Sequence, residues 1–200
     1  MFPVLTLVAL VVLLGTERAG ARVPGAVAKT AASIGFVATG LAAGLWTEGP
    51  ASRAILVGLV LGAVGDVFLI GRAKAPFLAG LVAFLANHVA YVVAFLMLGA
   101  DLRVAGLALV PLAAIAAVVW RWMGHRTGSL APAVMAYIAV ISVMVALAVG
   151  VGDPRLLVAA LLFYASDLCV ARERFVEHAP VNRYVGLPLY YAGQLLFALG

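Results

Sequence analysis

The stretch LLFYASDLCVARERF, residues 161–175, contains the pattern that decides the fold class. It begins as a run of apolar and small side chains and ends at two arginines, Arg172 and Arg174. An apolar helix that stops at basic residues is typical of a segment that crosses a membrane and ends in a cytoplasmic loop. Within the apolar part lies one carboxyl group, Asp167. Such a group costs roughly 2.5–3.5 kcal/mol at the centre of a membrane helix and less towards the interface.

The composition of the whole chain agrees with this membrane interpretation. Of its 200 residues, 66% are hydrophobic and 10% are charged, whereas a soluble domain averages about 25% charged residues. A chain this apolar needs lipid as its solvent. The net charge of +5 does not indicate nucleic-acid binding, because the basic residues lie between apolar runs, as in loops that face anionic headgroups. With no long polar linker, residues 1–200 are expected to form a single polytopic membrane domain.

Eight apolar segments follow one another along the chain. They span residues 2–15, 27–46, 54–71, 77–99, 103–122, 131–150, 155–171 and 184–200. A helix needs about 20 residues to cross the hydrocarbon, and most segments approach that length. The first is short enough for a signal peptide, but no basic residue precedes it, which favours a first transmembrane helix. We therefore expect an all-α integral membrane protein, a bundle of about eight transmembrane helices.

The basic residues of the connecting loops orient this bundle. Loops two, four and six contain only Arg53, Arg103 and Arg155. Loops one, three, five and seven contain the other ten: Arg18, Arg22, Lys29, Arg72, Lys74, Arg121, Arg126, Arg172, Arg174 and Arg183. The positive-inside rule then places the odd loops in the cytoplasm and both termini outside. Eleven of the thirteen basic residues are Arg, a usage typical of GC-rich bacterial genomes, so the expected location is a bacterial inner membrane.

Two of the eight acidic residues lie inside apolar segments. The other six are at loops or helix ends, where solvated surface charge accounts for them: Glu17, Glu48, Asp101, Asp153, Glu173 and Glu177. Asp66 and Asp167 each precede a basic loop by five residues, which predicts a similar depth and a shared site. Asp66 also shares a helix face with Gly58 and Gly62, and small residues at this spacing let helices pack closely. For each acid, a structural bond to a neighbouring Ser or Arg is the alternative.

The third helix of each half contains one of these acids. VGDVFLI and ASDLCVA occupy corresponding places, and Tyr91 and Tyr191 follow at similar distances. A parallel 4+4 repeat would bring equivalent helices to a pseudo-symmetric centre. The match is short, so the repeat predicted is weak.

Polar side chains on the fourth and eighth helices add to the candidate site. In FLAGLVAFLANHVAY, His88 and Tyr91 share a stripe and Asn87 lies beside it, which favours function over the commoner structural role of a lone histidine. In LPLYYAGQLL, Tyr190 and Gln194 are at i and i+4. For the tyrosines the alternative is an interfacial aromatic belt, but Gln194 is too deep for one.

Three residues at cytoplasmic helix ends, Lys29, Asn182 and Arg183, have the charge and hydrogen-bonding groups to hold a phosphate. For Arg183, ordinary positive-inside anchoring is the alternative. The single cysteine, Cys169, excludes an internal disulfide and a cysteine-cluster zinc site. His125 and His178 fall in cytoplasmic loops, so no metal and no cofactor are expected.

Several motifs, in order, resemble the YhhN family of membrane proteins, the lysoplasmalogenase family. They are Lys29, GDVFLI at 65–70, the pattern from Phe77 to Tyr91, SD at 166–167 and YYAGQ at 190–194. Thr30 departs from the family, which often has Pro there. The resemblance implies a membrane hydrolase that cleaves the vinyl ether of a lysoplasmalogen, a lysophospholipid, to a fatty aldehyde and a glycerophospho-headgroup. It also implies that Asp66 and Asp167 are essential.

Vinyl ether chemistry suits such a pair of acids. The bond is labile to acid, since protonation of its β-carbon gives an oxocarbenium ion that water attacks. Glycosidases meet the same demand with one protonated and one ionised carboxyl group. We expect Asp66, Asp167 and His88 to be catalytic, with either Asp as the acid. Those expected to bind substrate or water are Lys29, Asn87, Tyr91, Asn182, Tyr190 and Gln194.

Two other functions fit the same residues. Paired intramembrane acids near a repeat centre also occur in proton-coupled carriers of small molecules or lipids. A purely structural membrane protein is the third alternative, in which replacing the acids changes stability alone. Membrane lipid is an expected partner in every case, and the sequence does not indicate an oligomeric state.

Overall fold

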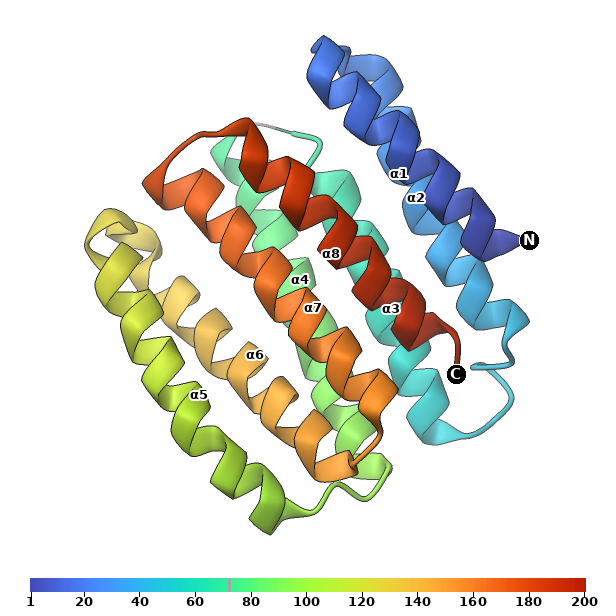
Figure 1. Cartoon of the computed structure of the whole chain (residues 1–200), viewed down its shortest axis with the longest axis vertical. Coiled ribbons are helices and arrows are strands. Elements are labelled where there is room, and N and C mark those ends of the chain that lie inside the picture. Colours follow the sequence, from blue (N-terminus) through green and yellow to red (C-terminus); the bar gives the residue numbers. More distant parts are fainter. Residues whose placement is uncertain (72) are drawn as a thin grey trace.

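The computed structural model describes residues 1–71 and 73–200, and α-helices dominate it (Figure 1). Arg72, one of the ten basic residues assigned to odd loops, lies outside the described residues. The helices are α1 Phe2–Ala19, α2 Arg22–Ala42, α3 Pro50–Phe68, α4 Lys74–Met97, α5 Leu102–Met123, α6 Ala131–Val151, α7 Pro154–Ala171 and α8 Pro180–Ala198. Short 3-10 turns span Gly124–Arg126 and Gly128–Leu130, and a π-helical turn spans Arg172–Val176. The all-α prediction with eight main helices is confirmed.

Seven of the described helices, α1 to α7, are long and apolar enough to cross a membrane. This confirms a multi-pass integral membrane protein. The remaining helix, α8, has 19 residues, as α3 does. Its lower hydropathy comes partly from polar side chains such as Asn182, Tyr190 and Gln194, which are buried inside the bundle.

Local sequence signals start several of these helices. The Asp101 carboxylate accepts hydrogen bonds from the backbone N–H groups of Arg103 and Val104, at 2.8 and 3.2 Å. Asp153 caps α7 in the same way through Arg155 N, at 2.8 Å. These bonds satisfy N–H groups that have no partner within the first turn of a helix. The two acids therefore have a capping role beyond solvated surface charge.

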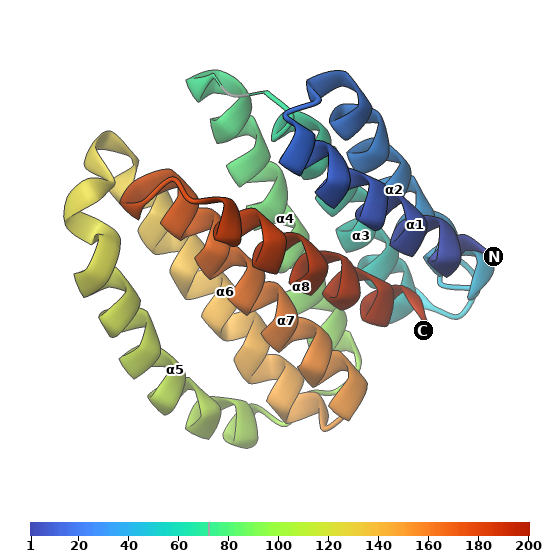
Figure 2. The same cartoon turned by 45° about the horizontal axis from the view of Figure 1, so that its top comes forward.

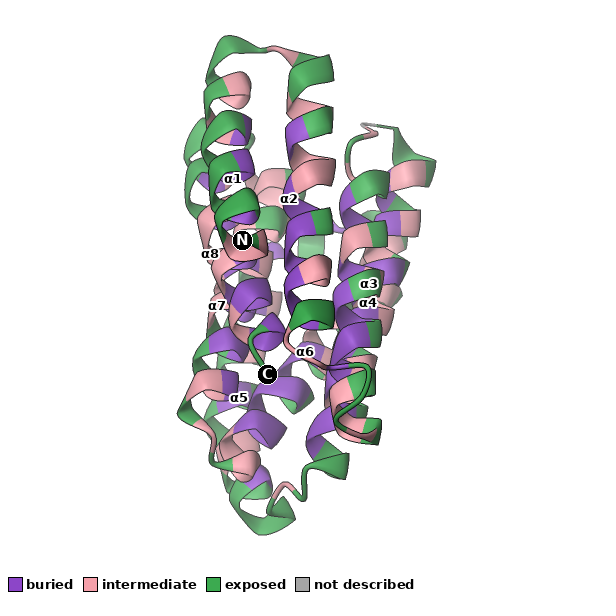
Figure 3. Ribbon diagram, turned by 90° about the vertical axis from the view of Figure 1, so that its right-hand side faces the viewer, coloured by how far each residue is buried: buried purple, intermediate pink, exposed green. Residues whose placement is uncertain are grey.

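The helices form four antiparallel hairpins, α1–α2, α3–α4, α5–α6 and α7–α8 (Figure 1). The hairpin α1–α2 lies at one edge of the bundle and α5–α6 at the other (Figure 2). The outward faces of α1 and α5 are largely exposed, and buried residues gather on the faces between the helices (Figure 3). Both termini lie at one end, opposite the loops after α1, α3, α5 and α7 (Figure 1). That this end faces outside, and that residues 1–200 are one domain, stay predictions.

The packing of the two halves is similar. Helix α4 of the first half packs on α6 of the second, and α8 packs on α2. These two contacts are equivalent if α5–α8 repeats α1–α4, as the weak 4+4 repeat predicts. Asp66 on α3 and Asp167 on α7 then occupy equivalent helices.

The start of two helices differs from the prediction. Helix α2 begins at Arg22 instead of residue 27, so Lys29 lies in its second turn and not at its start. Helix α8 begins at Pro180 instead of residue 184. Hydropathy missed these first turns because they contain charged and polar side chains. Prolines, however, are well tolerated in the first turn of a helix, as Pro24 and Pro180 are here.

Candidate active site

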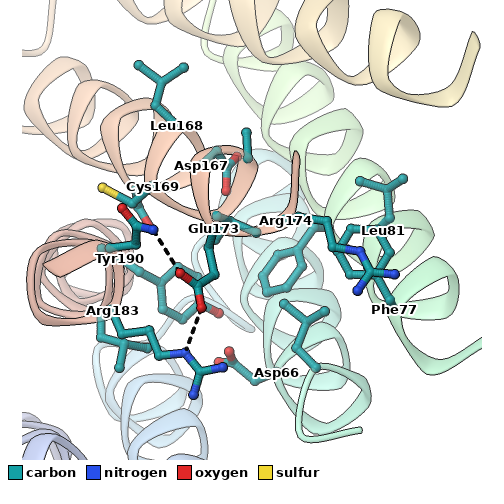
Figure 4. A pocket seen from close by; sticks show the side chains of 18 of the residues that line it. Asp66, Phe77, Leu81, Asp167, Leu168, Cys169, Glu173, Arg174, Arg183 and Tyr190 are labelled. Carbon is teal, nitrogen blue, oxygen red and sulfur yellow. Dashed lines mark hydrogen bonds and ion pairs between the residues drawn. The ribbon is translucent and has the colours of Figure 1, made fainter. Parts of the chain in front are cut away.

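A cavity of about 720 Å³ opens at the end of the bundle that contains the loops after α1, α3, α5 and α7. All eight helices contribute residues to its wall, and both intramembrane acids, Asp66 and Asp167, line it. The two carboxyl groups reach it from different helices, α3 and α7 (Figure 4). Of the other predicted site residues, Lys29, Asn182 and Tyr190 also line this cavity.

Asp66 is bound on both carboxylate oxygens by residues of α2. The Lys29 Nζ lies 3.0 Å from Oδ1, and the Ser33 hydroxyl donates to Oδ2 at 2.7 Å. The Asp66 side chain is only 2% exposed. A carboxylate buried this deeply is tolerated as a charge when a cation compensates it, and Lys29 is that cation. Asp66 is thus held as one half of an ion pair.

Asp167 has different neighbours. Its Oδ2 accepts a hydrogen bond from the Tyr137 hydroxyl on α6 at 2.8 Å and lies 3.4 Å from Nε2 of His88 on α4. Among the described residues, no Lys or Arg lies within ion-pair distance of this carboxyl group. Its side chain is 18% exposed, more than that of Asp66. The two acids therefore differ in both charge compensation and access to the cavity.

The orientation of the His88 ring follows from its second nitrogen. Nδ1 lies 2.6 Å from the carbonyl oxygen of Phe84, and because a carbonyl can only accept, Nδ1 carries a hydrogen. Nε2 faces Asp167, is buried and has no close hydrogen-bond partner among the described residues. In a neutral His88 this nitrogen presents a lone pair to Asp167. His88, Asp167 and Tyr137 together form a group that can hold and pass one proton.

The Tyr190 hydroxyl is held by a hydrogen-bonded pair of predicted site residues, Tyr91 and Gln194, which do not line the cavity. The Tyr91 hydroxyl donates to Gln194 Oε1 at 2.6 Å, and Gln194 Nε2 donates to the Tyr190 hydroxyl at 3.2 Å. Tyr91 and Gln194 are both fully buried. Because the Tyr190 hydroxyl accepts from Gln194, its own hydrogen can be donated to the Asp66 carboxylate or to a ligand in the cavity. Tyr91 and Gln194 thus position Tyr190, and the geometry gives them no direct contact with a cavity ligand.

Asn87 lies elsewhere, at the contact between α3 and α4. Its Nδ2 donates to the carbonyl oxygen of Gly58 at 2.6 Å, and it is fully buried away from the cavity wall. The structure therefore does not bring Asn87 together with the two acids.

The three residues expected to hold a phosphate are engaged with other protein groups. Lys29 pairs with Asp66, and Arg183 pairs with Glu17. Asn182 accepts from Arg172 at 2.7 Å and donates to Glu173 Oε2 at 2.7 Å. The Glu173 carboxylate thus contacts Asn182 through Oε2 and lies 3.6 Å from Arg183 Nε through Oε1, and Figure 4 shows it next to Arg183.

Two residues of the site were not predicted from the sequence. Ser33 is four residues after Lys29, so its position on the same face of α2 as that lysine was a usable signal. Tyr137 is one of two hydroxyl side chains in the apolar segment 131–150, with Ser142, a weaker signal that only its contact with Asp167 makes informative. In the described part of the chain, no group of three or more His, Cys, Asp or Glu side chains is placed to hold a metal ion.

Comparison with known proteins relates most of the chain to one family. The YhhN family profile matches residues 25–200. The lysoplasmalogenase TMEM86A of Bos taurus is 33% identical over 167 residues, which cover 75% of this chain and 65% of the relative. The Homo sapiens protein of the same name is 34% identical over 168 residues, with the same coverage. The chain thus spans slightly less than two thirds of the length of these relatives. No solved structure matches it significantly.

Proposed function

Because this chain belongs to the YhhN family, we propose that it is a lysoplasmalogenase-like membrane hydrolase. It would cleave the vinyl ether bond of a lysoplasmalogen to a fatty aldehyde and a glycerophospho-headgroup. Relatives that are one third identical and are named lysoplasmalogenases support this proposal. The reaction consumes only water, and the two carboxyl groups would supply the acid and the negative charge that it needs. The location that we propose is a bacterial inner membrane, with the cavity at the cytoplasmic end.

The observation that carries the proposal is the unequal environment of two acids in one cavity. Asp66 is an ion-paired carboxylate, whereas Asp167 lies between a phenol and an imidazole nitrogen with a free lone pair. Acid-catalysed cleavage of an ether needs one carboxyl group that carries a proton and one that carries a charge. We assign the proton to Asp167 and the charge to Asp66.

In the first step Asp167 transfers its proton to the β-carbon of the vinyl ether. The electron pair of the C=C bond forms the new C–H bond, and positive charge develops on the α-carbon and the ether oxygen. The negative charge of Asp66 stabilises this oxocarbenium ion, as preorganised charges do at developing opposite charges. Tyr190 lines the cavity and is placed to orient the polar atoms and the water, whereas His88 is buried outside the cavity wall and orients Asp167.

In the second step water adds to the cation and the two acids return to their starting states. Asp66 accepts one proton from the water as its oxygen bonds to the α-carbon, which gives a hemiacetal. Asp66 then donates this proton to the ether oxygen of the departing glycerol while Asp167 removes the hydroxyl proton. The C–O bond breaks, and aldehyde and alcohol leave. One water is consumed, and Asp167 is again protonated.

The test is aldehyde release by the purified protein in detergent. The substrate is a lysoplasmalogen, compared with an acyl lysophospholipid of the same chain length and headgroup. We expect aldehyde from the vinyl ether alone, and a loss of about 10²-fold or more in kcat for Asp66→Asn and Asp167→Asn. Asp101→Asn is the matched control, because Asn also caps helices and this residue lies at the opposite end of the bundle.

Thermal melting of each variant separates catalysis from folding. No aldehyde from the wild-type protein, or unchanged rates in both folded cavity variants, would overturn the proposal. Proton-coupled uptake of a small molecule into proteoliposomes would then favour the carrier function.

A further inference from the structure

Charged side chains are unevenly distributed over the wall of the cavity. They come from α1, α2 and α3, from the end of α7 with the π-helical turn after it, and from α8. They are Glu17, Arg22, Lys29, Asp66, Asp167, Glu173, Arg174 and Arg183. In the described parts of α4, α5 and α6, no lining residue is charged. The cavity therefore has a polar side towards α1, α2 and α8 and an apolar side towards α5 and α6.

The apolar side coincides with a separate hydrophobic cluster of the fold. Val119 and Met123 of α5 and Val134 of α6 form it, with partly buried Ile138 and Leu168 packed against them. All five residues line the cavity. We name this region the apolar arm: Val119, Met123, Val134, Ile138, Ile141 and Leu168. A long alkyl chain is the ligand that gains free energy in such a surrounding, about 0.8 kcal/mol for each buried methylene.

One acid belongs to the polar side, and the other lies at its border with the apolar arm. Asp66 is bound by Lys29 on α2, on the polar side. Asp167 is bound by Tyr137 on α6, which is one residue before Ile138 of the apolar arm. A vinyl ether bond is also a junction, because it joins an alkyl chain to a glycerophosphate. If the ether lies at the acids, the chain points along the apolar arm.

The α6 residues of the apolar arm also suggest a limit to chain length. Val134, Ile138 and Ile141 lie on one face of α6, in steps of four and three residues. From Val134 to Ile141 the helix rises by about 10 Å, at roughly 1.5 Å per residue. Ile141 is the deepest α6 residue of the wall and is 4% exposed. A bulkier side chain at the inner end of the apolar arm would therefore shorten the space for the alkyl chain of a lipid.

We propose that the apolar arm binds the hydrocarbon tail of a single-chain phospholipid, and that Ile138 and Ile141 determine which chain lengths fit. This inference rests on the proposed function for the orientation of the lipid. It concerns binding and not cleavage, so it can be tested with a lipid that has no vinyl ether. The source of the chain is the membrane lipid pool, and the headgroup lies towards α1, α2 and α8.

The experiment measures the Kd of the full chain in detergent for a homologous series of saturated acyl lysophospholipids, from short to long. Ile138→Phe and Ile141→Phe place a ring in the apolar arm. We expect the longest chains to bind about tenfold more weakly than to wild type, as the loss of two buried methylenes predicts, while the shortest chains bind equally. Val143→Phe is the matched control, since Val143 is on the same helix, 37% exposed and outside the cavity wall.

A second variant keeps the test decisive if the larger ring disturbs folding. Ile138→Ala widens the apolar arm, and we expect the preferred chain length to increase. Equal chain-length profiles for wild type, Ile138→Phe and Ile138→Ala, all folded, would overturn the inference, as would a shift in Val143→Phe of the same size. Chain-length-dependent binding without aldehyde release would refute the proposed reaction but leave the binding role of the apolar arm intact. Aldehyde release with the same chain-length profile in all variants would refute the binding role of the apolar arm but leave the proposed reaction intact.

Discussion

Lys29 and Asp66 form an ion pair across the contact between α2 and α3, with Nζ 3.0 Å from Oδ1. The lysine side chain is 15% exposed and the aspartate 2%, so neither charge is well solvated. Lys29 therefore has a role that its position in the sequence did not suggest. It pairs with the Asp66 carboxyl group in a membrane-spanning helix, where an uncompensated carboxylate would be costly.

Replacement of this lysine by a neutral residue should lower stability strongly. In Lys29→Met, Asp66 loses its only Lys or Arg partner among the described residues and keeps the Ser33 hydroxyl. We expect the free energy of unfolding to fall by about 3 kcal/mol, because one charge of a buried pair is left alone. The measurement is the Tm of the purified variant in the same detergent as the wild type.

The double variant Lys29→Met/Asp66→Asn is the matched control. It removes both charges, so its Tm should recover most of the loss while aldehyde release stays absent. A Tm of the single variant equal to that of the wild type would show that the pair does not hold the charge of Asp66. It would also remove the reason for assigning the charged role to Asp66.

The hydroxyl of Tyr137 should affect catalysis without affecting binding. It donates to Asp167 at 2.8 Å, and its ring lies 5.1 Å from that of His88. Tyr137→Phe keeps the ring but removes the hydrogen bond that orients the acid, so we expect kcat to fall about tenfold at an unchanged KM. Tyr184→Phe, an exposed tyrosine of α8, is the control. A rise in KM with kcat unchanged would mean that Tyr137 contacts the lipid and does not position Asp167.

Arg22 should contribute to binding of the phosphate group. It lines the polar side of the cavity, and among the described residues neither Arg22 nor Arg174 forms an ion pair with a carboxylate. For Arg22→Gln we expect KM to rise about tenfold at constant kcat, with a smaller difference at high salt. The control Arg103→Gln, at the opposite end of the bundle, should change neither KM nor kcat. An unchanged KM in Arg22→Gln would exclude this arginine from headgroup binding.

Much of the fold follows from sequence patterns that act locally. Each apolar segment must satisfy its own backbone hydrogen bonds in lipid, so hydropathy alone predicted the helices. The spacing of Gly58, Gly62 and Asp66 correctly predicted an acid directed into a helix contact. Helix starts were harder to locate, because Arg22 and Asn182 lie in first turns that hydropathy assigns to loops.

The roles within the site depend on contacts that no local pattern contains. Lys29 and Asp66 are 37 positions apart, and the sequence predicted a phosphate ligand where the structure has an ion pair. Tyr137 reaches Asp167 only because α6 packs on α7. Which acid holds a charge was therefore open from the sequence, since it depends on partners from other helices.

A substitution at Gly62 should test whether the hydrogen bond from Gln194 positions Tyr190. A Cβ added at Gly62 would collide with Gln194 Nε2 and lie 3.2 Å from the Tyr190 hydroxyl. Gly62→Ala must therefore displace the amide that orients Tyr190. We expect it to lower the free energy of unfolding by about 1–3 kcal/mol, as overpacking does, and to reduce aldehyde release in the folded fraction. Gly15→Ala on α1 is the control, because its added Cβ meets no heavy atom within 4 Å, and alanine there should be neutral or slightly stabilising. Equal Tm values and rates for the two variants would show that Gln194 and Tyr190 move freely, and that their hydrogen bond does not position Tyr190.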